Sequence, residues 1–299
     1  MSQAKPKKAV NSDTAGQSIS ASAIEGADLL LLLTTLLWGI NYSVVKYAIS
    51  DLVPINFVAL RFLLATTLMV VFMIASGRSL SVPRNDFLKL VGVAFLGNVL
   101  YQALFVYGIN LSRAGDTSIM LATAPIFTAI IGRARRLEFF RFRALVGLGL
   151  GFGGIVLLVS YAGSGGRGRG TVLGSCLLLL GAICWASYTV CMKPFAQAYG
   201  SVKATVLVMI TGTPMLIAIS IPTLLGQNWR AVRPASWAGV AYSGVFAIAI
   251  AYIIWSYGVH RIGPTRTAIY SNITPIAALA VAWPMLGERP RFGQVAGAI

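Results

Sequence analysis

The chain has 299 residues, of which 57% are apolar and only 11% are charged, and its mean hydropathy is +0.78. A water-soluble domain carries about 25% charged residues, so an ordinary soluble fold is excluded and most of the surface is expected to face lipid. The net charge of +16 does not indicate nucleic-acid binding. The basic residues lie between long apolar segments, and no RNA- or DNA-reading motif accompanies them.

The first 26 residues are polar and contain Lys5, Lys7 and Lys8. We expect this segment, 1–26, to be a disordered cytoplasmic tail. It has neither the short apolar core nor the cleavage site of a secretory signal, so the first apolar segment should remain as a membrane span.

Nine apolar segments follow, each close to the roughly 20 residues that a membrane-spanning helix needs. They cover residues 28–49, 54–76, 88–110, 115–132, 144–162, 172–193, 202–225, 237–259 and 264–286. A tenth begins after Arg291 and stops at Ile299, too soon to cross a bilayer. We therefore predict an all-α integral membrane protein of ten transmembrane helices, the tenth incomplete in this chain.

The loops between these segments predict the orientation of the protein. With the N-terminus inside, 15 of the 24 Lys and Arg residues lie on the cytoplasmic side and 7 lie outside. Cytoplasmic loops of membrane proteins are enriched in these residues, so the N-terminus is expected in the cytoplasm.

The two halves of the chain resemble each other in order. At an offset of 147, Trp38 and Lys46 match Trp185 and Lys193. At an offset of 150 the matches are Tyr107-Gly108 with Tyr257-Gly258, Pro125 with Pro275, and Glu138 with Glu288. We predict one repeat of five helices at 27–163, a Gly-rich linker at 164–170 and a second repeat at 171–299. Because five is odd, the second copy must be inverted, as in many secondary transporters.

Polar and aromatic side chains recur at helical spacing on one face of several predicted helices. Such side chains are costly in lipid unless they face protein or a water-filled cavity. The expected lining is Trp38, Asn41, Tyr42, Asn98, Tyr101, Gln102, Phe105, Trp185, Tyr188, Tyr252, Trp255, Ser256 and Tyr270, with Met120, Thr123 and Thr274 beside them. It is aromatic and neutral-polar without a strong fixed charge, which suits zwitterions with apolar side chains. Alternatively, these residues only pack the helices or form interfacial belts.

Each of several further residues within or at the ends of the predicted spans has two possible roles. Pro125 and Pro275 are expected to kink their helices and form hinges near the substrate, or only to shape the packing. Lys46 and Lys193 either gate the two mouths or extend to the lipid headgroups. Arg61 lies inside the second span, where we expect it to bind carbonyls or polar groups of the bundle.

The run Trp38-Gly39-Ile40-Asn41-Tyr42 and the run Leu286-Gly287-Glu288-Arg289 after Pro275 resemble the drug/metabolite transporter superfamily. The resemblance is to its EamA branch of ten-helix bacterial exporters and covers about residues 28–299. The aromatic lining is similar to that of amino-acid exporters of the YddG type. The resemblance to this family implies two inverted five-helix repeats around a central cavity and export of amino acids or related metabolites. Residues 133–138 depart from the family's Leu-Gly-Glu-Arg turn.

No Asp or Glu falls in the middle of a predicted span, and the single histidine, His260, ends one. Proton-coupled exporters commonly depend on a buried carboxylate. We therefore expect a monomeric, cofactor-free exporter of aromatic and other neutral amino acids in the bacterial inner membrane, acting by uniport or exchange. A proton-coupled drug or cation exporter and a nucleotide-sugar or phosphometabolite carrier remain as alternatives. An enzyme is disfavoured, because no catalytic or metal-binding cluster is present.

Overall fold

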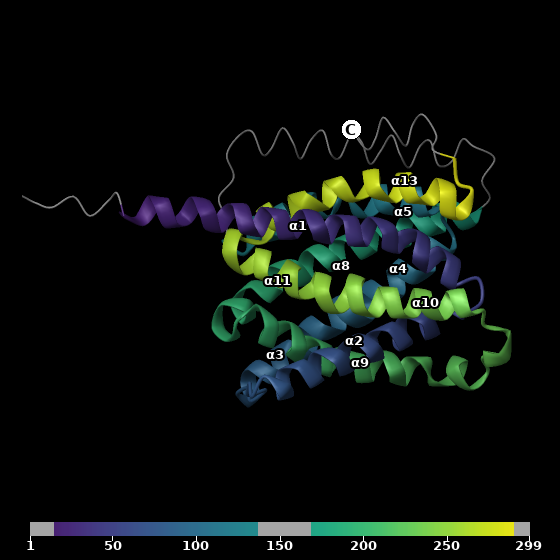
Figure 1. The fold of residues 1–299 in the computed structure, drawn as a ribbon, viewed down its shortest axis with the longest axis horizontal. Coiled ribbons are helices and arrows are strands. Elements are labelled where there is room, and N and C mark those ends of the chain that lie inside the picture. The colour runs from purple at the N-terminus through teal and green to yellow at the C-terminus, as the bar shows by residue number, and fades with distance from the viewer. Residues whose placement is uncertain (1–14, 137–168, 290–299) are drawn as a thin grey trace, which may run out of the picture.

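The computed structural model describes residues 15–136 and 169–289, and within them every regular element is a helix. The first half contains α1 (Ala15–Ala48), α2 (Pro54–Ala75), α3 (Arg84–Ala94), the π-helix η1 (Phe95–Leu100), α4 (Tyr101–Asn110), α5 (Ala114–Leu121) and α6 (Ala124–Ala134). The second half contains α8 (Arg169–Tyr199), α9 (Ser201–Leu225), η2 (Trp229–Ala231), α10 (Pro234–Tyr242), the π-helix η3 (Ser243–Ile250), α11 (Ala251–Ile262), α12 (Pro264–Ile269), η4 (Tyr270–Ile273) and α13 (Thr274–Leu286). They run nearly parallel to the long axis of the bundle (Figure 1).

These elements join into eight stretches that are long and apolar enough to cross a membrane. The stretches are Gly26–Ala48, Pro54–Ala75, Arg84–Asn110, Ala114–Ala134, Val172–Tyr199, Ser201–Leu225, Pro234–Ile262 and Pro264–Leu286. Each falls within a few residues of a predicted span, so the prediction of an all-α membrane protein is confirmed. The predicted span 144–162 and the incomplete tenth helix lie outside the described residues.

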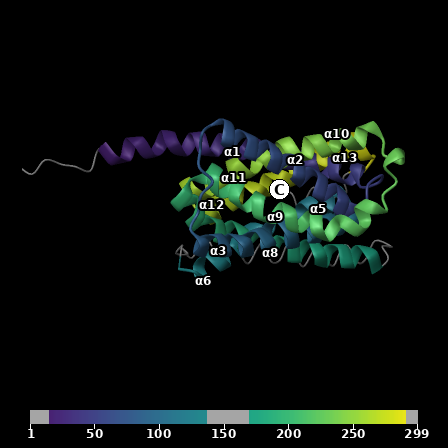
Figure 2. The same ribbon diagram turned by 90° about the horizontal axis from the view of Figure 1, so that it is seen from below.

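The first helix is longer than the sequence indicated. α1 begins at Ala15, within the segment expected to be disordered, and projects beyond the bundle (Figure 2). No proline lies between Ala15 and the membrane span, and alanine favours helix, so the first span continues outward as one helix.

The helix ends follow from local sequence. Five of the described helices, α2, α6, α10, α12 and α13, have proline in their first turn, where its missing N–H costs no bond within that helix. α13 ends at Gly287, whose φ of 68° is left-handed. There the Gly287 and Glu288 N–H groups donate to the carbonyls of Trp283 and Ala282, which closes the last turn.

The two halves run in opposite directions. α1 ends and α2 begins at the end of the bundle that holds Asp51, whereas α8 ends and α9 begins at the opposite end (Figure 1). Element boundaries also correspond, because α2 and α9 begin 147 residues apart and α3 and α10 begin 150 apart. Even the two π-helices, η1 and η3, fall in equivalent helices. The predicted inverted repeat is therefore present.

Three pairs of equivalent residues meet each other in space. Trp38 and Trp185 have ring centroids 5.4 Å apart. The Gln102 Nε2 atom donates to the Tyr252 hydroxyl at 2.7 Å, and the Thr66 and Thr213 hydroxyls are 2.6 Å apart. A two-fold rotation carries every residue onto its equivalent, so a residue can contact its own equivalent only near the rotation axis. These pairs therefore mark the pseudo-two-fold axis between the repeats.

The fourth span of each repeat is broken at the same place. α5 ends at Leu121 and α6 begins at Ala124, with Pro125 in its first turn. In the other repeat η4 separates α12 from α13, which carries Pro275 in its first turn. Each proline lacks the N–H that would bond four residues back, so both helices are irregular just before it.

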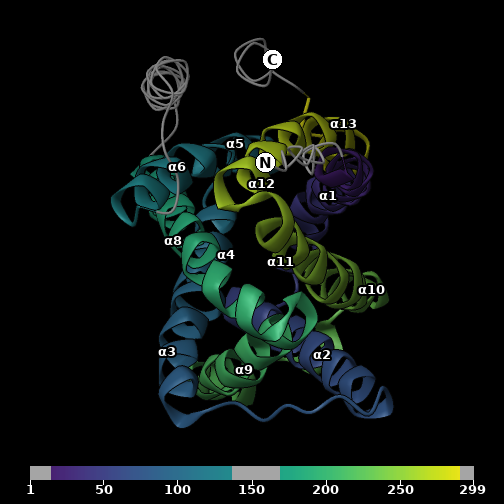
Figure 3. The same cartoon turned by 90° about the vertical axis from the view of Figure 1, so that its left-hand side faces the viewer.

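The outer face of the bundle is apolar, as a lipid-facing surface must be. Large exposed side chains include Leu29, Val71, Phe72, Ile74 and Leu225. Seen along the helices, α13 lies beside α1 and α9 lies beside α3, and the bundle surrounds a common centre (Figure 3).

Candidate functional site

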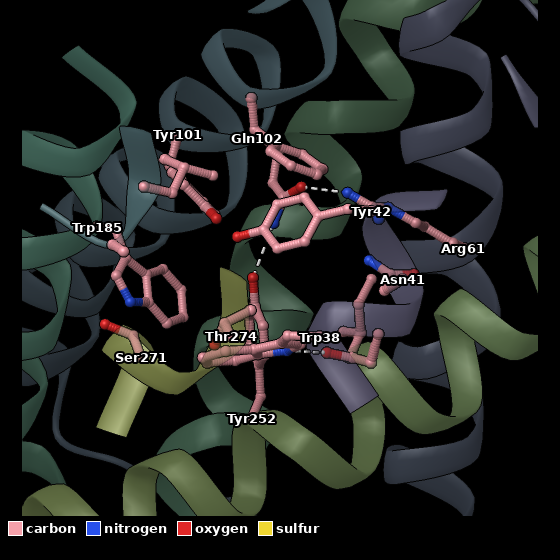
Figure 4. Close-up of a pocket in the computed structure, with 15 residues that line it drawn as sticks. Trp38, Asn41, Tyr42, Arg61, Tyr101, Gln102, Trp185, Tyr252, Ser271 and Thr274 are labelled. Atoms are coloured by element: carbon pink, nitrogen blue, oxygen red, sulfur yellow. Dashed lines mark hydrogen bonds between the residues drawn. The ribbon is translucent and has the colours of Figure 1, made fainter. Parts of the chain in front are cut away.

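A cavity of about 50 Å³ lies on the pseudo-two-fold axis, with walls from both repeats (Figure 4). It is lined by Trp38, Asn41, Tyr42, Arg61, Tyr101, Gln102, Phe105, Leu121, Ala122, Trp185, Ala247, Ile248, Tyr252, Ser271 and Thr274. One water needs roughly 10–15 Å³ of such space, so the cavity has room for only a few waters. A metabolite could enter only if lining side chains moved.

Aromatic rings occupy most of the space between the repeats. The Trp185 ring lies 5.0 Å from Tyr101, 5.4 Å from Tyr252 and 5.5 Å from Trp255, centroid to centroid. The Trp38 ring meets Trp185 edge-on, at an interplanar angle of 83°. Such tilted and edge-to-face pairs are favourable arrangements of aromatic rings. Their flat faces offer apolar contact and cation–π contact to a ligand.

The helices that hold these rings are irregular where the cavity lies. The Trp38 indole N–H donates to the Ala247 carbonyl at 2.9 Å, and Ala247 belongs to the π-helix η3. Insertions of this kind occur frequently at functional sites, because they redirect backbone and side chains. The broken fourth spans also border the cavity, through Leu121 and Ala122 in one repeat and Ser271 and Thr274 in the other.

Arg61 is the one charged side chain among the described residues of this wall. Its Nη2 donates to the Gln102 Oε1 atom at 2.5 Å and its Nη1 donates to the Ser243 hydroxyl at 3.2 Å. Ser243 in turn donates to the Asn41 side-chain oxygen. The expectation that Arg61 binds polar groups of the bundle is confirmed. The expectation of a lining without a strong fixed charge is wrong, because the guanidinium borders the cavity.

The surroundings of Arg61 are apolar on its other sides. The side chain is only 2% exposed, and its Cζ atom lies 5.1 Å from the Phe57 ring centroid and 5.5 Å from that of Phe105. Its Nε has no hydrogen-bond partner, and it forms no ion pair with any carboxylate of the described residues. Such a buried charge is costly unless fully paired.

Eight of the thirteen predicted lining residues border the cavity: Trp38, Asn41, Tyr42, Tyr101, Gln102, Phe105, Trp185 and Tyr252. Two more stand behind that wall, since Tyr188 packs on Trp185 at 5.1 Å and Trp255 packs on Trp38 at 5.0 Å.

The other three predicted residues point elsewhere. Asn98 donates to the Val208 carbonyl, Ser256 donates to the Ser201 carbonyl, and the Tyr270 hydroxyl donates to Asp28 at 2.5 Å. Helical spacing identifies a face, but that face is wider than the cavity.

The two equivalent lysines differ. Lys46 donates to the carbonyls of Ile109, Asn110 and Ser112 at 2.6–3.0 Å, whereas Lys193, within the described part of the chain, makes no hydrogen bond or ion pair. Lys46 thus closes the carbonyl end of α4.

Several of the residues that line the cavity were not among the predicted lining residues, including four small or apolar ones and Arg61. Leu121, Ala122, Ala247 and Ile248 are small or apolar and look like any other residue of a span. Arg61 had a clear signal, because an ionisable residue inside a membrane span usually faces a cavity or a partner.

The model of the EamA-like transporter family matches residues 26–160 and again 172–299. The chain belongs to this family. The two matches coincide with the two inverted repeats. Drug/metabolite transporters are thereby supported as the wider superfamily, and the protein is a multi-pass membrane transporter.

The chain is similar over most of its length to proteins that are named as uncharacterized transporters. It is 28% identical to an uncharacterized transporter of Archaeoglobus fulgidus over 91% of this chain and 93% of that one. It is 26% identical to the uncharacterized inner membrane transporter YedA of Escherichia coli K12, over 85% and 80%. A solved crystal structure shares the fold, with a TM-score of 0.68 at 20% identity over 92% of this chain and 95% of that one.

Proposed function

We propose that this EamA-like transporter exports amino acids, aromatic and other neutral ones, or closely related metabolites. It would act by alternating access, as a uniporter or exchanger. We further propose that it works as a monomer in a bacterial inner membrane with its N-terminus in the cytoplasm. The observation that carries the proposal is an aromatic cavity, with one buried cation, on the axis between two inverted repeats.

The chemistry of the lining supports this substrate class. Indole and phenol rings accept flat apolar side chains, and their π faces attract an ammonium group. Amide and hydroxyl groups of Asn41, Gln102 and Ser271 offer hydrogen bonds at the same wall. An amphipathic zwitterion matches both properties.

The alternatives are less well supported by the same wall. Within the described spans, Asp28, Asp86 and Asp116 each lie at the third residue of their stretch, far from its middle. A proton-coupled cation exporter needs a carboxylate in the cavity itself, where the proton and the substrate compete for it. A nucleotide-sugar or phosphate ester carries at least two negative charges, whereas one guanidinium lines the described cavity.

Uptake into proteoliposomes tests the proposal. The panel comprises phenylalanine, leucine, a charged amino acid, a nucleotide-sugar and a cationic dye. We expect saturable uptake of the neutral amino acids without an imposed pH gradient. Uptake of the dye alone, driven only by a pH gradient, would contradict the proposal and favour drug export.

Trp185→Ala sharpens this test. Trp185 contacts rings of both repeats, so we expect its loss to reduce phenylalanine uptake more than it reduces protein abundance, and more than it reduces leucine uptake. Removing a buried Trp also costs about 3–5 kcal/mol of stability, so uptake must be normalised to folded protein. Equal losses of uptake and abundance would make Trp185 a packing residue only.

A further inference from the structure

Arg61 presents a buried charge that the fold alone leaves incompletely satisfied. A guanidinium has five N–H donors. Nη2 and Nη1 donate to Gln102 and Ser243, and Nε has no partner among the residues that the structure describes. Both bonded acceptors are neutral, although the natural partner of a planar guanidinium is a carboxylate with two oxygens.

The position of Gln102 is the second part of the argument. Its Oε1 lies 2.5 Å from Arg61, and its Nε2 donates to Tyr252 at 2.7 Å (Figure 4). Its side-chain oxygen thus occupies the place that a carboxylate oxygen would take. The amide is neutral, so it solvates Arg61 without neutralising it.

We propose that Arg61 forms a carboxylate-binding subsite, and that the substrate's free carboxylate replaces the Gln102 oxygen on the guanidinium. The subsite takes compounds with one free carboxylate and an apolar or aromatic portion, which lies against Trp38 and Trp185. This inference rests on the proposed function for the identity of the site as a substrate site. It goes further in naming the group that the protein recognises and the residue that recognises it.

Displacement of Gln102 also links binding to the contact between the repeats. Gln102 and Tyr252 are equivalent residues that bond across the pseudo-two-fold axis. When a carboxylate takes over Arg61, Gln102 is free to leave Tyr252, and the space it vacates enlarges a cavity of only about 50 Å³. Substrate binding then loosens a bond that joins the two halves, as alternating access requires.

The charge of the site restricts the substrate. No carboxylate of the described residues pairs with Arg61, so the empty site holds one uncompensated positive charge. One carboxylate neutralises it, whereas a compound without a carboxylate leaves the buried cation unpaired. The site therefore prefers an amino acid to its amide or to the corresponding amine.

Gln102→Glu tests the subsite with a change of almost no volume. The new carboxylate would lie at hydrogen-bond distance from Arg61 and occupy the subsite permanently. We expect L-phenylalanine binding, followed by tryptophan fluorescence of the purified protein, to weaken at least about tenfold. Binding of L-phenylalaninamide, which has no free carboxylate, should not weaken.

Gln102→Leu is the matched control, because it removes the amide without adding a charge. Because it leaves the Arg61 guanidinium available to a carboxylate, it should weaken L-phenylalanine binding far less than Gln102→Glu does. Arg61→Lys keeps the charge but loses the planar fork, so it should weaken L-phenylalanine binding and retain part of its preference over the amide. This variant also serves if the Gln102→Glu protein does not fold.

The binding measurement separates this inference from the proposed function. Carboxylate-dependent binding without any flux in proteoliposomes would overturn transport of amino acids and leave the subsite standing. Equal binding of L-phenylalanine and its amide to the wild type would overturn the subsite, even where both are transported. Failure of both compounds to bind would overturn it as well.

Discussion

The two ends of the bundle are built from equivalent segments of the two repeats, but they are fastened differently. At the end that holds Asp51, the Arg233 Nε donates to the Asp51 carboxylate at 2.8 Å and Ser236 donates to it at 2.6 Å. At the opposite end, which holds Asp86, the described bonds between the repeats run from phenol hydroxyls to carboxylates: Tyr199 donates to Asp86 and Tyr270 donates to Asp28, each at 2.5 Å.

Further contacts between the repeats strengthen the Asp51 end. The Gln227 side chain accepts the Val53 N–H at 2.9 Å and donates to the Asp51 carbonyl at 3.1 Å. Glu288 accepts the Ala114 N–H at 3.0 Å and lies 3.7 Å from the Arg113 guanidinium. Side chains of both repeats are therefore joined at the Asp51 end by an ion pair and by several hydrogen bonds to backbone groups.

The sequence explains why the opposite end cannot form the same contacts. At offsets of 147 and 150, the counterparts of Asp51 and Arg233 are Ala198 and Pro83, neither of which carries a charge. Inverted repeats share a backbone plan, but their loops need not share chemistry. The two closed states of such a carrier are therefore held by different interactions and respond differently to mutation.

Among the variants considered, Asp51→Arg should change the accessibility of the cavity from the Asp51 end the most. It removes the ion pair and places two guanidinium groups against each other, so the Asp51 end should open. A cysteine at Ala122, in a protein with Cys176, Cys184 and Cys191 replaced by serine, would report the opening. We expect a membrane-impermeant maleimide to label it severalfold faster from the Asp51 end.

Asp86→Arg is the matched variant at the other end, where it breaks the bonds to Tyr199 and Lys89. It should not speed labelling from the Asp51 end. If both variants gave the same labelling from each end, the asymmetry described here would have no bearing on opening.

Lys46→Met should destabilise the protein more than Lys193→Met. Lys46 binds three carbonyl groups, and hydrogen bonds to a charged group contribute about 1.5–3 kcal/mol when buried. Because Lys46 is half-buried, we expect a loss of about 1–2 kcal/mol, and under about 0.5 kcal/mol for Lys193. Thermal unfolding in detergent measures both, and equal shifts would contradict the prediction.

Gln227→Leu should moderately destabilise the first turn of α2, because the Gln227 side-chain oxygen accepts the Val53 N–H just before that helix begins. Loss of a side-chain cap costs about 0.5–2 kcal/mol. α9, the equivalent helix, follows Gly200, and no side chain of the described residues accepts the Gly200 N–H as Gln227 accepts that of Val53, so α9 offers the comparison. We expect hydrogen exchange to increase in the first turn of α2 and to stay unchanged in α9; an increase in both would indicate general loosening.

A change of pH near neutrality is expected to change the opening of the Asp51 end the least. The hydrogen bonds from Arg233 and then Ser236 hold the pKa of Asp51 well below its usual value of about 3.9. A depressed pKa means that the contribution of the ion pair is fully present above the unfolded value and is lost only as pH falls toward the folded one. Thiolate reactivity itself rises with pH, so labelling must be divided by that of a fully exposed cysteine at the same pH. This ratio, measured from the Asp51 end, should be constant between about pH 5 and 8.

Salt supplies the contrast to that prediction, since the Arg233 side chain is half exposed and its attraction is screened. Labelling should rise with ionic strength. A strong dependence on pH near neutrality would assign closure to another group.

Much of the fold could be predicted because membrane spans and repeats leave local signals. The apolar segments located all eight described spans, and Trp38 with Trp185 identified the equivalent first helices of the repeats. The residues that line the cavity were harder to predict than the spans. Asn98 and Gln102 share a helical face, but Asn98 bonds to Val208 and Gln102 faces the cavity, a distinction set by which neighbour packs there.

The sequence by itself determined that the chain crosses the membrane repeatedly, that its halves are inverted copies and that aromatic residues gather near the middle. These properties depend on hydrophobicity and periodicity, which act along the chain. Only the tertiary structure decided that Arg61 meets Gln102 and no carboxylate of the described residues, and that Asp51 meets Arg233. Those contacts join residues 41 and 182 positions apart, and they exist only after the helices pack.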